Sequence, residues 1–148
     1  MRLPGWLEPL LAADAMRATD RWAIETVGIP SLELMERAGE GLARVTSQAA
    51  PAGRVAIVVG KGNNGGDGLV AARLLRGAGR EVAVLTVWPP DTLTGDAAEQ
   101  LRRLPGEPPA AFDPARLEGA AVLVDALLGT GTTGAPRDPA GAVAVVGR

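Results

Sequence analysis

The fold of this chain is decided by residues 54–68, which read Arg54-Val55-Ala56-Ile57-Val58-Val59-Gly60-Lys61-Gly62-Asn63-Asn64-Gly65-Gly66-Asp67-Gly68. The continuous apolar run from Arg54 to Gly60 predicts a strand that is buried on both faces. A loop of Gly and Asn follows, and the apolar spacing after Leu69 predicts a helix just beyond it. Glycine tolerates positive φ and lets backbone N–H groups approach a ligand, while a helix start offers free donors to an anion. The stretch therefore predicts a site for a phosphorylated ligand.

Patterns on both sides of this stretch predict alternating helices and strands. We expect helices over residues 14–27, from 31 onward, from 69 to Gly77 or Gly79, and over 94–104, with strands over 54–60, 81–87 and 120–124. Ser31 is the expected N-cap of the second helix, and Met35, Ala38, Leu42 and Val45 are its expected core face. Such alternation predicts an α/β fold with parallel βαβ units, in which ligands bind beyond the carboxyl ends of the strands.

Composition narrows the possible functions. The 148 residues suit one domain, and a net charge of −2 gives no support for binding nucleic acid or a membrane. No apolar run is long enough for a membrane span, and no signal peptide is expected at the N-terminus. Cysteine is absent, which excludes disulfides and favours a cytoplasmic location. His and Tyr are absent too, so acid–base chemistry must fall to Asp, Glu or Lys.

Two common classes of protein that contain glycine-rich loops do not match this sequence. Gly60-x-Gly62-x-x-Gly65 satisfies the dinucleotide fingerprint in a strand-to-helix context. That fingerprint also expects an acidic residue at the end of the next strand, where this chain has Val87-Trp88-Pro89-Pro90. An ordinary NAD-dependent dehydrogenase is therefore disfavoured. A Walker A loop is disfavoured as well, because no Gly-Lys-Ser/Thr follows.

A second polar loop is predicted on the same rim. Asp125 follows the predicted strand over 120–124, and the loop Gly129-Thr130-Gly131-Thr132-Thr133-Gly134 comes next. Asp125 suits a ligand role or a loop cap, and Asp67 suits a helix N-cap or catalysis. Thr132 and Thr133 suit phosphate binding or turn formation. Lys61 reads as a solvated charge that can attract phosphate, and Asp20 and Glu36 read as surface charges or interface residues.

Three separated blocks carry a resemblance to a known family. They are Met16 to Asp20 with Gly28 to Gly39, then Gly60-Lys61-Gly62-Asn63-Asn64-Gly65-Gly66-Asp67-Gly68-Leu69-Val70-Ala71-Ala72-Arg73, then Val124 to Gly131 with Arg137-Asp138-Pro139. In this order they resemble the YjeF N-terminal domain family, the NAD(P)H-hydrate epimerases. The resemblance implies a Rossmann-like three-layer α/β/α fold with a mainly parallel sheet.

The resemblance also implies an activity and its residues. Enzymes of this family are isomerases that interconvert the R and S forms of hydrated NADH and NADPH (NADHX and NADPHX), so that a partner dehydratase, sometimes fused, can restore the cofactor. A homodimer is usual. Carried over by position, the substrate-binding residues are Asn63, Asn64, Gly65, Gly66, Asp67, Gly129, Thr130, Gly131, Thr132, Thr133, Gly134 and Ala135. Asn64 and Asp125 become oxygen ligands of a potassium ion, a role that suits amide and carboxylate oxygens.

Two departures from the family pattern limit what the resemblance implies. Some members place a Lys where this chain has Thr133. The family's V-D-x-P-S-G-like segment, which carries the main acid–base Asp and a potassium-binding Ser, is not found up to Arg148. The expectation is therefore a domain that is C-terminally incomplete, from an epimerase or an epimerase–dehydratase fusion, with its catalytic Asp beyond Arg148. The alternative is a catalytically inactive nucleotide-binding or scaffold module of the same fold.

Overall fold

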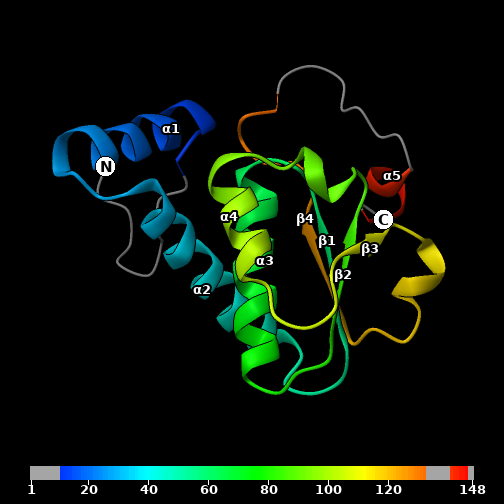
Figure 1. Cartoon of the computed structure of the whole chain (residues 1–148). Coiled ribbons are helices and arrows are strands. Elements are labelled where there is room, and N and C mark those ends of the chain that lie inside the picture. Colours follow the sequence, from blue (N-terminus) through cyan, green and yellow to red (C-terminus); the bar gives the residue numbers. More distant parts are fainter. Residues whose placement is uncertain (1–10, 133–140, 147–148) are drawn as a thin grey trace, which may run out of the picture.

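A computed structural model describes residues 11–132 and 141–146, which form a parallel sheet covered by helices (Figure 1). The four strands lie in the order β3-β2-β1-β4, and all pairs are parallel. The elements are α1 (Ala13–Trp22), the π-helical turn η1 (Ala23–Val27), α2 (Ser31–Ala49), β1 (Val55–Val59), α3 (Asn63–Gly77), β2 (Val82–Thr86), the 3₁₀ turn η2 (Pro90–Thr92), α4 (Gly95–Arg103), β3 (Ala110–Ala111), the 3₁₀ turn η3 (Pro114–Leu117), β4 (Val122–Ala126) and α5 (Ala142–Val146). The predicted α/β class with a parallel sheet is confirmed.

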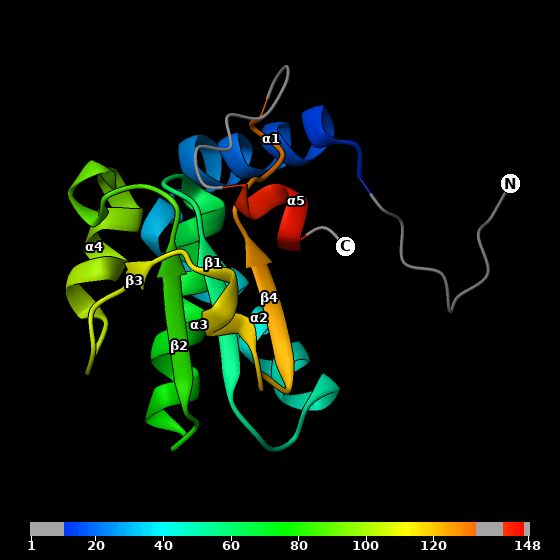
Figure 2. The ribbon, with the colours of Figure 1, turned by 90° about the vertical axis from the view of Figure 1, so that its right-hand side faces the viewer.

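Strand β1 is the centre of the sheet. All five of its residues are buried, as the continuous apolar run predicted. Its last residue, Val59, pairs with Thr86 of β2 on one side and with Ala126 of β4 on the other. The carboxyl ends of these three strands therefore meet at one edge, with α1 lying across it in Figure 2.

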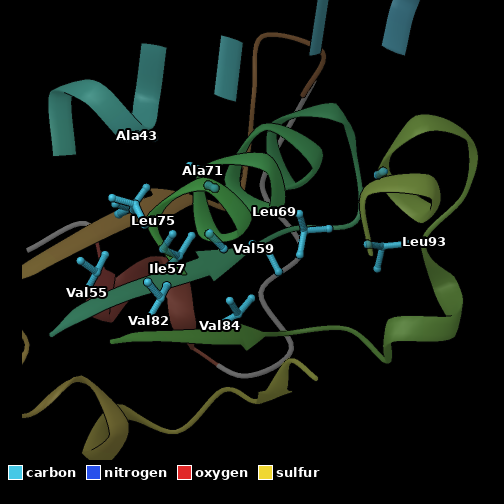
Figure 3. Close-up of a cluster of buried hydrophobic side chains, with 14 residues drawn as sticks. Ala43, Val55, Ile57, Val59, Leu69, Ala71, Leu75, Val82, Val84 and Leu93 are labelled. Carbon is cyan, nitrogen blue, oxygen red and sulfur yellow. The ribbon is translucent and has the colours of Figure 1, made fainter. Parts of the chain in front are cut away.

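Helices cover both faces of the sheet. α2, α3 and α4 lie on one face, and α5 and η3 lie on the other (Figures 1 and 2). Alternate residues of β1 serve the two layers: Ile57 packs in the cluster with Leu69 and Leu75 of α3, shown in Figure 3, whereas Val58 packs with Leu85 and Ala142. This arrangement confirms the three-layer α/β/α expectation.

The helix of the glycine-rich stretch begins earlier than predicted. α3 starts at Asn63, inside the loop, and the Gly66 N–H donates to the Gly62 carbonyl at 3.1 Å. None of the loop glycines has positive φ. At all of them except Gly62 the fold leaves no room for a side chain: a Cβ on Gly65 would lie 1.9 Å from the Gly60 oxygen, and one on Gly68 would lie 2.8 Å from the Ala126 Cβ. Close packing, rather than unusual backbone conformation, explains this glycine density.

Details of the second helix differ from the expectation. Ser31 is its first residue and not its N-cap, since Pro30 holds that position and no side chain caps it. The buried face of α2 is Met35, Gly39, Ala43 and Thr46. Of the predicted stripe, Ala38 and Val45 are exposed. Helices α2 and α3 cross closely at Gly39, where a Cβ would meet Val70 at 2.3 Å. The face of α2 that packs on α3 is therefore shifted by one residue from the predicted one after Met35.

The structure differs from the sequence expectations at one edge strand and at one charged residue. The short edge strand β3 was not among the strands expected from the sequence, because two residues carry no periodicity. Glu36 is not a free surface charge, because it pairs with Arg73 of α3 and accepts a hydrogen bond from Gln100 of α4.

Within residues 11–132 and 141–146, no helix has both the length and the apolar character needed to cross a membrane.

Candidate functional site

A cavity of about 840 Å³ opens at the carboxyl edge of the sheet. Five parts of the chain line it: α1, one residue of α2, the start of α3 with the residues before it, Trp88 after β2, and the segment after β4. The lining residues are Met16, Arg17, Asp20, Ala38, Lys61, Gly62, Asn63, Asn64, Asp67, Trp88, Leu127, Leu128, Gly129, Thr130, Gly131 and Thr132. The cavity lies where open parallel sheets bind their ligands.

The two polar loops predicted to share a rim touch each other. The Nδ2 of Asn64 donates a hydrogen bond to the Leu128 carbonyl at 3.2 Å. Gly129 packs against the same side chain, because a Cβ added there would lie 3.2 Å from the Asn64 Cβ. Thr132 donates its N–H to the Gly129 carbonyl at 3.1 Å, which folds the second loop into a turn. Asn64 therefore ties the start of α3 to the loop that follows β4.

The remaining residues of the predicted binding set are placed differently. Asn63, Asp67, Thr130 and Gly131 line the cavity, whereas Gly65 and Gly66 are buried and do not. Gly66 packs instead toward Met35 and Ala97. Thr133, Gly134 and Ala135 lie outside the described residues. The binding roles of all these residues stay predictions.

Asp125 belongs to the rim but not to the cavity lining. It lies within β4, one residue before the strand's end, in register with Val58 of β1. Its Oδ1 accepts the Leu127 N–H at 3.0 Å, so it shapes the turn into the second loop. This is the loop-cap role that the sequence left open, and no donor among the described residues bonds to its second oxygen.

Asp67 is the unusual carboxyl group of the cavity. Because α3 begins at Asn63, Asp67 is the fifth residue of the helix and not its N-cap. Burial of its side chain, which is only partly exposed, and next the negative charge of Asp20 on α1, raise the pKa of Asp67 from 3.8 to about 6. A carboxyl group with this pKa can hold or release a proton near neutral pH.

Two cationic lining residues come from different elements. Arg17 of α1 donates to the Thr130 carbonyl and pairs with Asp14, so it fastens α1 over the second loop. The Lys61 Nζ lies 5.9 Å from the centroid of the Trp88 ring. Sequence reasoning missed Arg17 and Trp88 as site residues. The position of α1 had no sequence signal, but the parallel register of β1 and β2 could have placed Trp88 beside Lys61.

The donor set at the rim suits an alkali cation better than a transition metal. In the described part of the chain, no three acidic side chains gather to hold a metal ion. Asn64 uses its Nδ2 on Leu128, which leaves its Oδ1 as an acceptor, and Asp125 has one free oxygen. Oxygen ligands of this kind fit potassium.

A parallel sheet with two polar loops around a cavity at its carboxyl edge defines a ligand-binding α/β protein of the open-sheet class. Residues 31–146 match the family model described as YjeF-related protein N-terminus. The chain belongs to this family.

Curated relatives agree with this assignment. The chain is 41% identical to an NAD(P)H-hydrate epimerase of Rhodopirellula baltica, over 83% of this chain and 53% of the relative. It is 44% identical to an NAD(P)H-hydrate epimerase of Pirellula staleyi, over 82% of this chain and 58% of the relative. It is also 43% identical to a bifunctional NAD(P)H-hydrate repair enzyme Nnr of Salinibacter ruber, over 88% of this chain and 28% of the relative. The chain thus spans little more than half of the two epimerases.

The fold is shared with a yeast protein. The crystal structure of yeast ynu0 superposes with a TM-score of 0.74 over 93% of this chain and 64% of that protein, at 23% identity. At this identity the comparison establishes the fold alone.

Proposed function

We propose that this protein is an NAD(P)H-hydrate epimerase, an isomerase that interconverts the R and S forms of hydrated NADH and NADPH. The observation that carries the proposal is the cavity in which Asn64 joins the two loops and Asp67 faces the lining. Relatives at about 40% identity are named NAD(P)H-hydrate epimerases.

The cavity supplies groups for each part of such a substrate. The free N–H groups at the start of α3 and the turn at Gly129–Thr132 suit the pyrophosphate. Epimerisation at the hydrated ring carbon needs a proton donor and a proton acceptor close to that carbon. Among the described lining residues, Asp67 has a pKa that permits both states near neutral pH.

We further propose that Asn64 and Asp125 bind a potassium ion at the rim. The ion would offset the charge of the substrate's phosphates. The support is one oxygen on each residue that accepts no hydrogen bond from the described residues, at the start of α3 and near the end of β4, and Asn64 contacts the segment that follows β4. Replacing Asp125 by Ala should raise the potassium concentration needed for half-maximal activity, whereas the control Asp91→Ala should not.

The test uses the complete protein as its gene encodes it. Purified S-NADPHX is followed by chromatography, and the protein should speed the appearance of the R form well beyond the spontaneous rate. Asn64→Leu, which removes the inter-loop hydrogen bond, should reduce kcat/KM by about tenfold or more. Arg44→Met, which removes an exposed cation of α2, should not.

Failure of the wild-type protein to speed the interconversion would overturn the proposal. Potassium-dependent binding of NADP⁺ without turnover would favour the inactive binding module instead. Loss of activity in Arg44→Met to the same extent as in Asn64→Leu would remove the link to the site.

We also infer partners and location. A dehydratase that consumes one epimer is the expected partner, separate or fused, and the name of the Salinibacter ruber relative supports a link with repair of the hydrate. A homodimer would cover apolar side chains that α1 and η1 expose, among them Trp22 and Val27. The chain has no Cys, which is compatible with a cytoplasmic location.

A further inference from the structure

The register of the sheet places Lys61 beside Trp88. Val59 of β1 pairs with Thr86 of β2, and each strand ends there. Lys61 and Trp88 are each two residues further along their strands, so they emerge next to each other at the carboxyl edge. The Lys61 Nζ lies 5.9 Å from the Trp88 ring centroid, within the range of a cation–π interaction. Both residues line the cavity.

In dinucleotide-binding sheets, the charge of the residue at the end of the second strand determines which substituent on the adenosine ribose is accepted. An acidic residue at the end of the second strand accepts hydrogen bonds from the hydroxyl groups of the adenosine ribose and repels a phosphate there. Here Trp88 and two prolines occupy the strand end, and the first acid, Asp91, lies beyond them in η2. A substituent on that ribose would meet an ammonium group in place of a carboxylate.

The two residues differ in how they are held. Trp88 is partly buried and packs against the cluster of Val58, Leu85 and Leu127, so the core fixes its position. Lys61 is exposed and makes no ion pair within the described residues. Arg17, the other cation of the lining, already contacts Asp14 and the Thr130 carbonyl. Lys61 is therefore the cation that keeps its hydrogen-bond donors available to a ligand.

We propose that Lys61, held over Trp88, forms a subsite for a phosphate on the adenosine ribose, so that the protein prefers NADPHX to NADHX. The inference rests on the proposed function for the identity of the substrate. The subsite itself takes any adenosine nucleotide that carries a ribose phosphate in this position.

The binding test uses two fragments, adenosine 2′,5′-bisphosphate and 5′-AMP, titrated calorimetrically into the complete protein. We expect the bisphosphate to bind about tenfold more tightly, as one charge-assisted contact in a partly exposed site provides. Lys61→Met should abolish this preference, Lys61→Arg should retain most of it, and the control Arg44→Met should leave it intact. Raising the salt concentration should reduce it.

A second measurement needs no variant. Lys61 is the only lysine in the 148 residues, so peptide mass spectrometry can follow its acetylation by acetic anhydride. The bisphosphate should slow the labelling of Lys61 several-fold more than 5′-AMP at equal concentration. Equal protection by the two fragments, or a preference that survives in a folded Lys61→Met protein, would overturn the subsite.

Activity measurements separate this inference from the proposed function. A wild-type protein that binds the bisphosphate selectively but epimerises neither hydrate would refute the proposed function and keep the subsite. A protein that epimerises NADHX and NADPHX with equal kcat/KM, unchanged in ratio by Lys61→Met, would refute the subsite and keep the function.

Discussion

Single glycines set how closely the chain packs around the cavity. The Gly65 Cα lies against the Gly60 carbonyl, so that a Cβ would meet its oxygen at 1.9 Å. We predict that Gly65→Ala lowers the free energy of unfolding by about 3 kcal/mol or more, because backbone atoms cannot yield as a side chain can. Urea denaturation measures the change.

Gly41 is the matched control for this substitution. It also lies inside a helix, α2, but a Cβ there would meet nothing within 4 Å. Gly41→Ala should raise the free energy of unfolding by about 0.5–1 kcal/mol through helix propensity. Similar effects of the two substitutions would contradict the packing explanation.

Asp67 makes the stability of the fold depend on pH. Its pKa is about 6 in the folded protein, above its ordinary value of 3.8, so the folded state binds the proton more tightly than the unfolded state. Wild-type stability therefore falls as pH rises from about 4 to about 6 and stays lower above that range. Asp67→Asn should be about 1–2 kcal/mol more stable than wild type at pH 8, after allowance for solvent screening, and equal at pH 4.

Thermal unfolding at both pH values checks this prediction. The control is Asp91→Asn on the turn η2, where Asp91 is exposed. Its effect on the free energy of unfolding should be small and the same at both pH values. A stabilisation by Asp67→Asn that is as large at pH 4 as at pH 8 would show that removal of the charge is not the cause.

At the scale of elements, a polar network joins the three helices of one layer. Glu36 of α2 pairs with Arg73 of α3, and the fully buried Gln100 of α4 donates its Nε2 to the Glu36 Oε2 at 3.3 Å. The side chains of Arg73 and Glu36 are only 25% and 28% exposed. Desolvation therefore makes this pair matter more than an ordinary surface ion pair.

Removing one member of this network should destabilise the fold more than removing one member of a surface ion pair. We predict that Arg73→Met lowers the free energy of unfolding by about 2 kcal/mol, because the Glu36 carboxylate then keeps Gln100 as its single partner among the described residues. Arg37→Met, which removes an exposed pair with Glu33 of the same helix, should cost about 0.5 kcal/mol or less. Equal costs in urea denaturation would count against the network.

At the scale of the whole molecule, α1 and η1 carry apolar side chains that residues 11–132 and 141–146 leave exposed. Trp22 is 58% exposed, and Val27 is 50% exposed. The sequence predicted an amphipathic helix over residues 14–27, but of its apolar face only Ala23 is buried. We predict that the protein self-associates through this surface.

Light scattering at several protein concentrations measures the association. Trp22→Glu should shift the protein toward monomers, because it places a charge in the contact. Val45→Glu is the control, since Val45 is equally exposed but lies fourteen residues into α2, away from α1 (Figure 1). A wild-type protein that remains monomeric at all concentrations would refute the prediction.

Much of the fold could be predicted from local patterns. The buried run before Gly60 predicted β1, and the alternation of strands and helices predicted that the strands run parallel. The pair Asp113-Pro114 has the residue types of an N-cap followed by a first helical position, and Asp113 does accept the Ala115 N–H at 2.9 Å. The start of α3 was misplaced because five glycines hide a helical segment from any propensity argument.

The sequence by itself determined that two polar loops follow parallel strands on one rim of the sheet, because strand type and loop chemistry are local properties of the chain. It also supplied Asn64, Asp67 and Asp125 as the polar groups of that rim. Only the tertiary structure decided which of them face one cavity, that Asp20 of α1 helps raise the pKa of Asp67, and that Lys61 lies over Trp88. The reason is that helix packing and strand register bring these groups together from distant positions, and no local pattern encodes the distance between them.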